Sequence, residues 1–264
     1  MVHGADTAAP SAAPLERAIA FSHRIAGRGS YHPYFLAMDG CLVLAVALGW
    51  LVGQQAGDSS SAGLAICAAA TFYFPGYPAF LALKRRFYGE ESRSYLLDTL
   101  LFLLPCFFLL CYVTGQRLDL AAEFLGLALP AMCGLIRLGC FTGGCCFGGP
   151  SRLGVRYDPR LLTKRSKSWR RFTPGDDPGT RVFPIQLVDS AVNWGLFALL
   201  SSAALSGRWS PDTLLPRYLV LYGAFRFGAE FFRGERSHRA YGLLSRTQWL
   251  SLMIVTVCSA LLVA

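Results

Sequence analysis

Seven long apolar runs constrain this chain more than any other feature. They lie at about residues 35–55, 61–83, 95–113, 119–142, 182–205, 214–232 and 247–264. Crossing the hydrocarbon core of a bilayer takes roughly 20 mostly apolar residues in helical form. Of the 264 residues, 53% are hydrophobic and only 16% are charged, which is too apolar for a soluble domain of this length. The sequence therefore predicts an all-α, polytopic membrane helical bundle of about seven transmembrane helices.

The remaining residues form an N-terminal segment and one long connection. Residues 1–34 are rich in Ala, Pro, Ser and Gly, and we expect a flexible or amphipathic segment without a cleavable signal. The seven-span domain then occupies 35–264. Its connection 149–181 is polar and is the one candidate for a small extramembrane head. Pro75 and Pro78 predict a kink or a break in the second run.

Basic residues are divided unequally between the two sides of the membrane that these spans define. The side with the N-terminus and the connection 149–181 carries 20 of the 25 Lys and Arg residues, and the other side carries three. The positive-inside rule places the more basic side in the cytoplasm. Because these charges lie in loops between spans, the net charge of +9 favours anionic lipid headgroups over nucleic acid as partners.

The most informative stretch is residues 136–148, Ile-Arg-Leu-Gly-Cys-Phe-Thr-Gly-Gly-Cys-Cys-Phe-Gly. An arginine such as Arg137 costs roughly 2.5–3.5 kcal/mol in the middle of a bilayer, so it is retained where an anion or a water-filled cavity meets it. Glycines such as Gly144 and Gly148 let backbone N–H groups approach a ligand closely. This stretch predicts a polar pocket inside the membrane that accepts something negatively charged.

Two later runs carry polar side chains that share one helix face. In the run 214–232 they are Tyr222, Arg226, Glu230 and Arg233, which fall within about 80° at 100° per residue. In the run 182–205 they are Gln186, Asp189 and Asn193. Neither face is tolerable toward lipid, so we expect both to point into the bundle, with Asn193 forming an interhelical hydrogen bond.

Arg137 and Arg226 come from different spans and suit a phosphate diester, because guanidinium groups bind phosphate oxygens bidentately. We expect both to point into one cavity. In a membrane, the available phosphate ester is a phospholipid. The structural alternative is that the two arginines pair with Glu123 and Glu230 and only hold the bundle together.

The chain has nine cysteines, and most of them lie inside apolar runs as small hydrophobic residues. Three lie in the Gly-rich stretch: Cys140, Cys145 and Cys146. Their spacing is not a usual zinc spacing and no histidine is near, so we expect reduced thiols that line the pocket and bind no metal. A disulfide from Cys140 to either of the others is geometrically open. A lipid adduct on Cys140 is a further hypothesis, set against the simple packing role that we favour.

Three blocks resemble motifs of the bacterial prolipoprotein diacylglyceryl transferases. Arg137–Gly148 is similar to the family's Arg-x-Gly-Asn-Phe-x-x-Gly-Glu-x-x-Gly, and Phe183–Asp189 is loosely similar to His-Pro-x-Gln-Leu-Tyr-Glu. The third block, Tyr222–Arg233 followed by Gly242–Ser251, is the closest match. The resemblance covers roughly residues 95–264 and the same seven-span plan.

The resemblance implies an enzyme of the bacterial plasma (inner) membrane that moves the diacylglyceryl group of phosphatidylglycerol to the lipobox cysteine of a preprolipoprotein, without a cofactor. Arg137 and Arg226 would hold the phosphate, while Tyr222, Glu230 and Arg233 would shape the cavity. The same resemblance assigns the headgroup site to Cys140, Gly144, Gly148, Gln186 and Asp189. It also places the connection 149–181 outside, against the charge count, and we follow the family here.

The departures from the family concern the proton acceptor. The family's His-Gly-Gly is absent, its Asn and Glu in the first block are Cys140 and Cys145, and its His-Pro histidine is Phe183. Asp98, at the start of the third run, is then the candidate base. The alternatives are a non-catalytic, lipid-binding paralogue that kept the anion pocket and, ranked last, a redox or metal protein that uses the three cysteines.

Overall fold

A helix forms at each of the seven predicted runs, which confirms the all-α class. The computed structural model describes residues 13–25, 33–55, 61–88, 96–157, 181–233 and 242–263. The runs become α2 (Pro33–Gln55), α3 (Ser61–Phe72) with α4 (Gly76–Tyr88), α5 (Leu96–Val113), α6 (Leu118–Thr142), α7 (Ile185–Leu205), α8 (Leu214–Ala229) and α9 (Arg246–Val263).

The described part of the chain holds five helical stretches that are long and apolar enough to cross a membrane, rather than the seven expected. Two of the predicted runs give shorter helices. The apolar part of α5 is Thr99–Val113, and α8 ends after 16 residues at Ala229. The chain is nevertheless a multi-pass membrane protein by the length and composition of its helices.

The second run is broken at its prolines, as predicted. α3 ends at Phe72 and α4 begins at Gly76, after a turn that contains Pro75. A Cβ atom at position 76 would lie 2.2 Å from the carbonyl oxygen of Thr71. Because that approach is closer than any side chain permits, the break needs glycine as well as proline at this turn.

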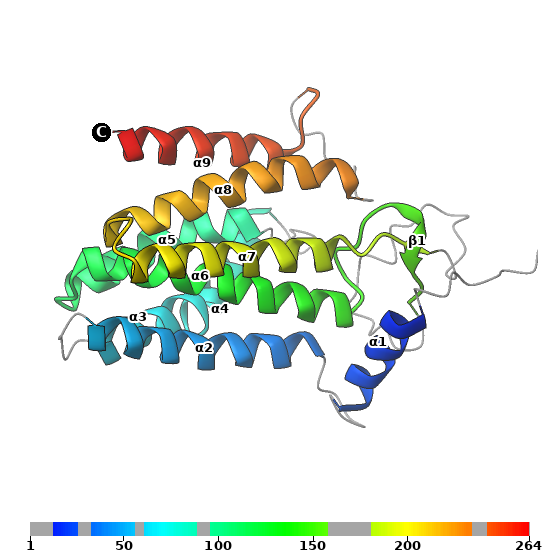
Figure 1. Cartoon of the computed structure of the whole chain (residues 1–264), viewed down its shortest axis with the longest axis horizontal. Helices are drawn as coiled ribbons and strands as arrows, with labels where there is room; N and C mark the ends of the chain where they lie inside the picture. Colours follow the sequence, from blue (N-terminus) through cyan, green and yellow to red (C-terminus); the bar gives the residue numbers. More distant parts are fainter. Residues whose placement is uncertain are drawn as a thin grey trace, which may run out of the picture.

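α6 is the centre of the bundle. Most of its residues are buried, whereas the other candidate spans expose most of theirs, and it packs against α2, α7 and α8 (Figure 1). Small residues make this possible, because a Cβ at Gly126 would lie 2.6 Å from the Cβ of Leu214 and one at Gly134 would lie 2.8 Å from the indole nitrogen of Trp194. The helix that carries Arg137 is therefore the one most shielded from lipid.

The strand β1 (Pro150–Val155) and the helix α1 (Ala13–Ile25) lie together at one end of the bundle (Figure 1). Ile19 of α1 is buried against an apolar cluster that contains Phe141, Phe147, Val155, Tyr157 and Val182. The backbone N–H of Arg156 also donates to Oε1 of Glu16 at 3.1 Å. Part of the expected N-terminal segment is thus a helix docked on this end, while residues 158–180 of the expected head lie outside the described residues.

The polar face predicted for the run 214–232 does not extend to Arg233, because the helix ends before that residue. α8 gives way to one turn of 3₁₀ helix at Glu230–Phe232, and Arg233 has extended backbone with φ −76° and ψ 133°. Arg233 pairs as an antiparallel bridge with Gly148. The prediction that Arg233 shares the helical face of Tyr222 and Arg226 is therefore wrong, because the chain leaves the helix to meet the Gly-rich turn.

Candidate active site

Arg137 forms a buried ion pair with Asp189. Its Nε lies 2.7 Å from Oδ2 of Asp189, and the two side chains are only 6% and 3% exposed. The pair joins α6 to α7 in the interior of the bundle. The alternative that Arg137 pairs with Glu123 is therefore wrong, because a carboxylate on the neighbouring helix compensates its charge.

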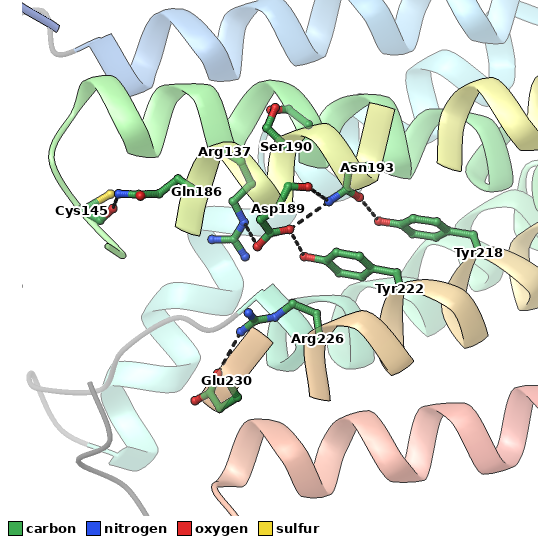
Figure 2. A network of polar contacts seen from close by, with 11 residues as sticks. Arg137, Cys145, Gln186, Asp189, Ser190, Asn193, Tyr218, Tyr222, Arg226 and Glu230 are labelled. Carbon is green, nitrogen blue, oxygen red and sulfur yellow. Dashed lines mark hydrogen bonds and ion pairs between the residues drawn. The ribbon is translucent and has the colours of Figure 1, made fainter. Parts of the chain in front are cut away.

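Asp189 is also the centre of a hydrogen-bond network that reaches α8 (Figure 2). Its Oδ1 accepts from the hydroxyl of Tyr222 at 3.1 Å and from Nδ2 of Asn193 at 3.0 Å. The Tyr218 hydroxyl donates to Oδ1 of Asn193 at 2.9 Å, which confirms the interhelical hydrogen bond expected of Asn193. With every carboxylate contact made inside the bundle, Asp189 fixes the position of Arg137 and leaves little freedom to either side chain.

Tyr218 belongs to this network and was not singled out from the sequence. It lies one turn before Tyr222, and the two rings stack with centroids 5.4 Å apart. The spacing of four residues is the signal that could have found it, since residues i and i+4 share a helix face.

Arg226 is buried but only partly satisfied. Its Nη2 lies 3.2 Å from Oε2 of Glu230, and the two side chains are 3% and 11% exposed. Its Nε and Nη1 have no hydrogen-bond partner among the described residues. The ion pair with Glu230 that the structural alternative predicted is present. The three N–H groups on Nε and Nη1 of Arg226 still have no acceptor among the described residues. A buried donor without a partner costs about 1–3 kcal/mol and more when it is charged, so the site favours an added acceptor.

The charges around Arg226 leave one positive charge in excess. Arg137, Asp189 and Arg233 lie within electrostatic range of its guanidinium. With Glu230 included, three cations face two carboxylates. The Nε of Arg233 also has no hydrogen-bond partner among the described residues. One monoanion with several acceptor oxygens, such as a phosphate diester, completes both the charge balance and the hydrogen bonding.

A cavity of about 260 Å³ opens beside Arg137. Its walls are apolar side chains of the N-terminal half, such as Phe72, Leu103 and Met132, and its polar end is Arg137 with the three cysteines of the Gly-rich turn. This combination of an apolar wall and a cationic end suits an amphipathic ligand. Arg137 lines this cavity and Arg226 does not, so the expectation that both arginines point into one cavity stays a prediction.

The Gly-rich turn brings Cys140, Cys145 and Cys146 together, and all three are free thiols that line the cavity as expected. The Cys140 and Cys145 thiols donate to Cys146, and with Arg233 and Arg137 near they hold the pKa of Cys146 well below its ordinary value. The hydrogen bonds that the Cys145 thiol donates to Cys140 and Cys146, together with burial, raise the pKa of Cys145. Of these two thiols, Cys146 is therefore the one whose surroundings favour loss of the proton.

Gln186 and Gly148 anchor the Gly-rich turn to neighbouring segments through hydrogen bonds. Nε2 of Gln186, which is 1% exposed, donates to the carbonyl oxygen of Cys145 at 2.7 Å. The backbone N–H of Gly148 donates to the carbonyl oxygen of Phe183 at 2.8 Å, and that of Gly149 donates to the carbonyl oxygen of Phe232 at 3.2 Å. The turn is thus fastened to the start of α7 and to the end of α8, which carry the carboxylate and the second arginine.

We expect Gly148→Ala to destabilise the protein by about 1–3 kcal/mol, as overpacking does. A Cβ there would lie 2.8 Å from the carbonyl oxygen of Phe232 and 3.0 Å from that of Phe183, and neither backbone can move without breaking the turn. The free energy of unfolding in detergent measures the effect. Gly195→Ala in α7 is the control, since nothing lies within 4 Å of its added Cβ and no loss is expected. Equal stability of the two variants would contradict this account of Gly148.

The candidate base is not placed by the structure. Asp98 lies in the first turn of α5, but its side chain lies outside the described residues. The four histidines of the sequence also have no described side chain. Phe183, which stands where the resemblance puts a histidine, is half-buried, and its backbone pairs with Gly148 and Gly149.

The fold and the site together define a multi-pass membrane protein with a buried, incompletely neutralised arginine pair beside an amphipathic cavity. Residues 99–264 match the model of the prolipoprotein diacylglyceryl transferases, and the chain belongs to this family. The resemblance inferred from the three motifs is thereby confirmed, and it covers the described helices from α5 to α9.

Two curated relatives carry the same activity in their names. The chain is 30% identical over 146 residues to the phosphatidylglycerol–prolipoprotein diacylglyceryl transferase of Clostridium tetani, which covers 54% of this chain and 50% of that one. It is 27% identical over 132 residues to phosphatidylglycerol–prolipoprotein diacylglyceryl transferase 2 of Clostridium perfringens, which covers 49% and 45%. The matched segments span about half the length of these relatives.

Proposed function

We propose that this chain is a phospholipid-dependent diacylglyceryl transferase, which moves the diacylglyceryl group of phosphatidylglycerol to a cysteine thiol of a lipoprotein precursor. The observation that carries the proposal is the buried guanidinium of Arg226, whose Nε and Nη1 lack partners among the described residues. The lipid named for the two relatives has the phosphate diester that such a group recognises.

The reaction places new charge where the arginines lie. The acceptor sulfur attacks the glyceryl carbon that carries the phosphate, a C–S bond forms, and the C–O bond breaks with its electron pair leaving on glycerol phosphate. The phosphate starts with one negative charge and leaves with almost two at neutral pH. Fixed donors that meet this growing charge stabilise the transition state more than the bound lipid, which is the requirement for catalysis.

The side chains divide into those that contact the lipid and those that position them. Arg226 and Arg137 bind the phosphate and its headgroup, and Arg233 supports them at the rim. Asp189 and Tyr222 hold Arg137, and Glu230 holds Arg226. These six side chains come from α6, α7 and the segment from α8 to Arg233, so we expect a point change in one of them to disturb the others.

The turn residues give the site its shape. Gln186 fixes the carbonyl of Cys145, and Gly144, with φ +66°, reverses the chain after α6. Gly148 admits the carbonyls of Phe183 and Phe232. Cys140 lines the polar end of the cavity. Asp98 is the proposed proton acceptor of the lipobox thiol.

A lipid-binding paralogue without activity is the second candidate. The absence of the family's His-Gly-Gly and the cysteines at positions 140 and 145 favour it, because they remove groups that the family pattern contains. It shares the anion site and the cavity, so lipid binding alone cannot distinguish the two functions.

We place the protein in the bacterial plasma membrane, with the end that carries β1 and α1 facing outward. Support comes from the family and from the Gly-rich turn of the site, which packs against α1 and β1 at this end of the bundle. In this proposal the basic side chains on this side serve the anionic lipid substrate, which reconciles their excess with an outward orientation.

The test is transfer by the purified, full-length protein in vesicles. Incubation with a lipobox peptide and phosphatidylglycerol should raise the peptide's mass by one diacylglyceryl group, measured by mass spectrometry. Vesicles of phosphatidylethanolamine alone are the matched control and should give no shift. A peptide of unchanged mass in both lipids, while phosphatidylglycerol still binds the protein, would establish the second candidate instead.

A further inference from the structure

Three sulfur atoms converge in the cavity beside Arg137. The Sγ atoms of Cys140, Cys145 and Cys146 all lie within 4.8 Å of one another. Cys140 belongs to the last turn of α6, whereas the other two follow the Gly143–Gly144 turn. The sulfurs therefore meet because the chain reverses after the helix, which the linear spacing allows but does not require.

The turn is built to hold this arrangement. Gly144 has φ +66° and Cys146 has φ +59°, a conformation that a residue with a side chain rarely adopts. Residues in such conformations persist only where the surroundings hold them, and they cluster at functional sites. Here the holding group is the buried amide of Gln186, which donates to the carbonyl oxygen of Cys145 at 2.7 Å.

The distances fit a thiolate-bound ion. A zinc–sulfur bond of about 2.3 Å places the sulfurs of a tetrahedral or trigonal site about 3.8–4.0 Å apart, so a contraction of less than about 1 Å is enough. No fourth His, Cys, Asp or Glu joins the cluster among the described residues. Three protein ligands with a fourth position open to a cavity are the arrangement of catalytic, rather than structural, zinc sites.

The surrounding charge also fits. Three thiolates and one Zn²⁺ ion carry one net negative charge. Arg233 and Arg137 lie within electrostatic range of Cys146 and attract a cluster of this charge. The cluster is therefore suited to a divalent ion without any further anion.

We propose that Cys140, Cys145 and Cys146 bind one Zn²⁺ ion whose open fourth position takes the acceptor thiol as a thiolate. The inference rests on the proposed transfer function and departs from the expectation, based on spacing alone, that the cysteines bind no metal. Zinc deprotonates a coordinating thiol outright. The thiol proton goes to Asp98, the proposed acceptor, and the sulfur attacks the glyceryl carbon. A C–S bond forms while the C–O bond breaks with its electron pair leaving on glycerol phosphate, and the resulting thioether leaves the metal. The ion thus supplies the thiolate that the family's missing histidine cannot.

The first experiment measures the metal in the purified, full-length protein, kept reduced and loaded with Zn²⁺. We expect one Zn²⁺ per chain, with three sulfur ligands at about 2.3 Å by X-ray absorption spectroscopy. Replacing any one ligand should weaken zinc binding by more than about 100-fold, which exceeds the loss seen when a residue that only orients a ligand is changed. The variants are Cys140→Ser, Cys145→Ser and Cys146→Ser. Cys133→Ala is the matched control, because Cys133 lines the same cavity outside the cluster and its loss should leave the metal content unchanged.

A protein that takes up no zinc when loaded, or whose zinc is equally retained by all four variants, would overturn the site. The second experiment compares transfer by zinc-loaded and chelator-treated protein. We expect loss of transfer on zinc removal and recovery on readdition. Equal transfer by the two forms would overturn thiol activation and leave the proposed function intact, whereas bound zinc with no transfer in either form would overturn the proposed function and leave the metal site standing.

Discussion

Arg226→Lys is expected to lower the rate of diacylglyceryl transfer by about 100-fold to 1,000-fold, as the loss of one fixed donor at a developing oxyanion does. The lysine keeps the charge and can still reach Glu230, which lies 3.2 Å from Nη2 in the wild type. It cannot also present the fork formed by Nε and Nη1, the two atoms without partners among the described residues. The rate is measured in phosphatidylglycerol vesicles under single-turnover conditions.

Arg208→Lys is the matched control for this change. Arg208 is exposed and follows α7, so its replacement should leave the rate within about twofold of wild type, in line with the small effects of surface changes. The lipid affinity of Arg226→Lys is measured beside the rate. A donor that acts on the leaving phosphate affects the rate of transfer more than the affinity for the lipid. Wild-type turnover by Arg226→Lys would rule out a bidentate phosphate contact at this position.

The sequence predicted the helices well because hydrophobic length is a local property. Each predicted run contains a helix, and the break in the second run falls at Pro75 as expected. The count of candidate spans is lower because the apolar part of α5 is only Thr99–Val113 and because α8 ends at Ala229, where Glu230 begins a 3₁₀ turn. The 100° periodicity of the polar residues predicted a helix that continues through Arg233. Arg233 instead pairs with Gly148, and a local sequence pattern carries no information about such a long-range contact.

The polar residues were predicted better than their partners. The cost of burying Arg137 and Arg226 shows from the sequence that each needs compensation, but it does not say by which carboxylate. Glu123 shares a helix with Arg137, yet Asp189 of α7 pairs with it, because α6 and α7 pack together in the interior. The sequence placed Cys140, Cys145 and Cys146 at the pocket, but it did not predict that all three sulfurs converge, because that depends on the left-handed backbone at Cys146.

Asp189→Asn should be the most destabilising change in the site, by about 3–5 kcal/mol, because it leaves Arg137 as an uncompensated buried charge. Oδ2 of Asp189 lies 2.7 Å from Nε of Arg137, with both side chains almost inaccessible. Transfer should be lost as well, since Asp189 positions the arginine. Asp119→Asn is the matched control: its pair with Arg117 is as short, at 2.6 Å, but is about half exposed, and exposed pairs contribute about 0–1 kcal/mol.

The double variant Arg137→Gln/Asp189→Asn separates stability from function. Removing both charges abolishes the unpaired cation, so the double variant should be more stable than Asp189→Asn alone in a double-mutant cycle of unfolding free energies in detergent. Its transfer activity should not return, because a glutamine cannot neutralise a leaving phosphate. Recovery of both stability and transfer would show that the pair serves only the bundle. Recovery of stability without transfer is the result expected if Asp189 exists to hold a phosphate-binding arginine inside the membrane.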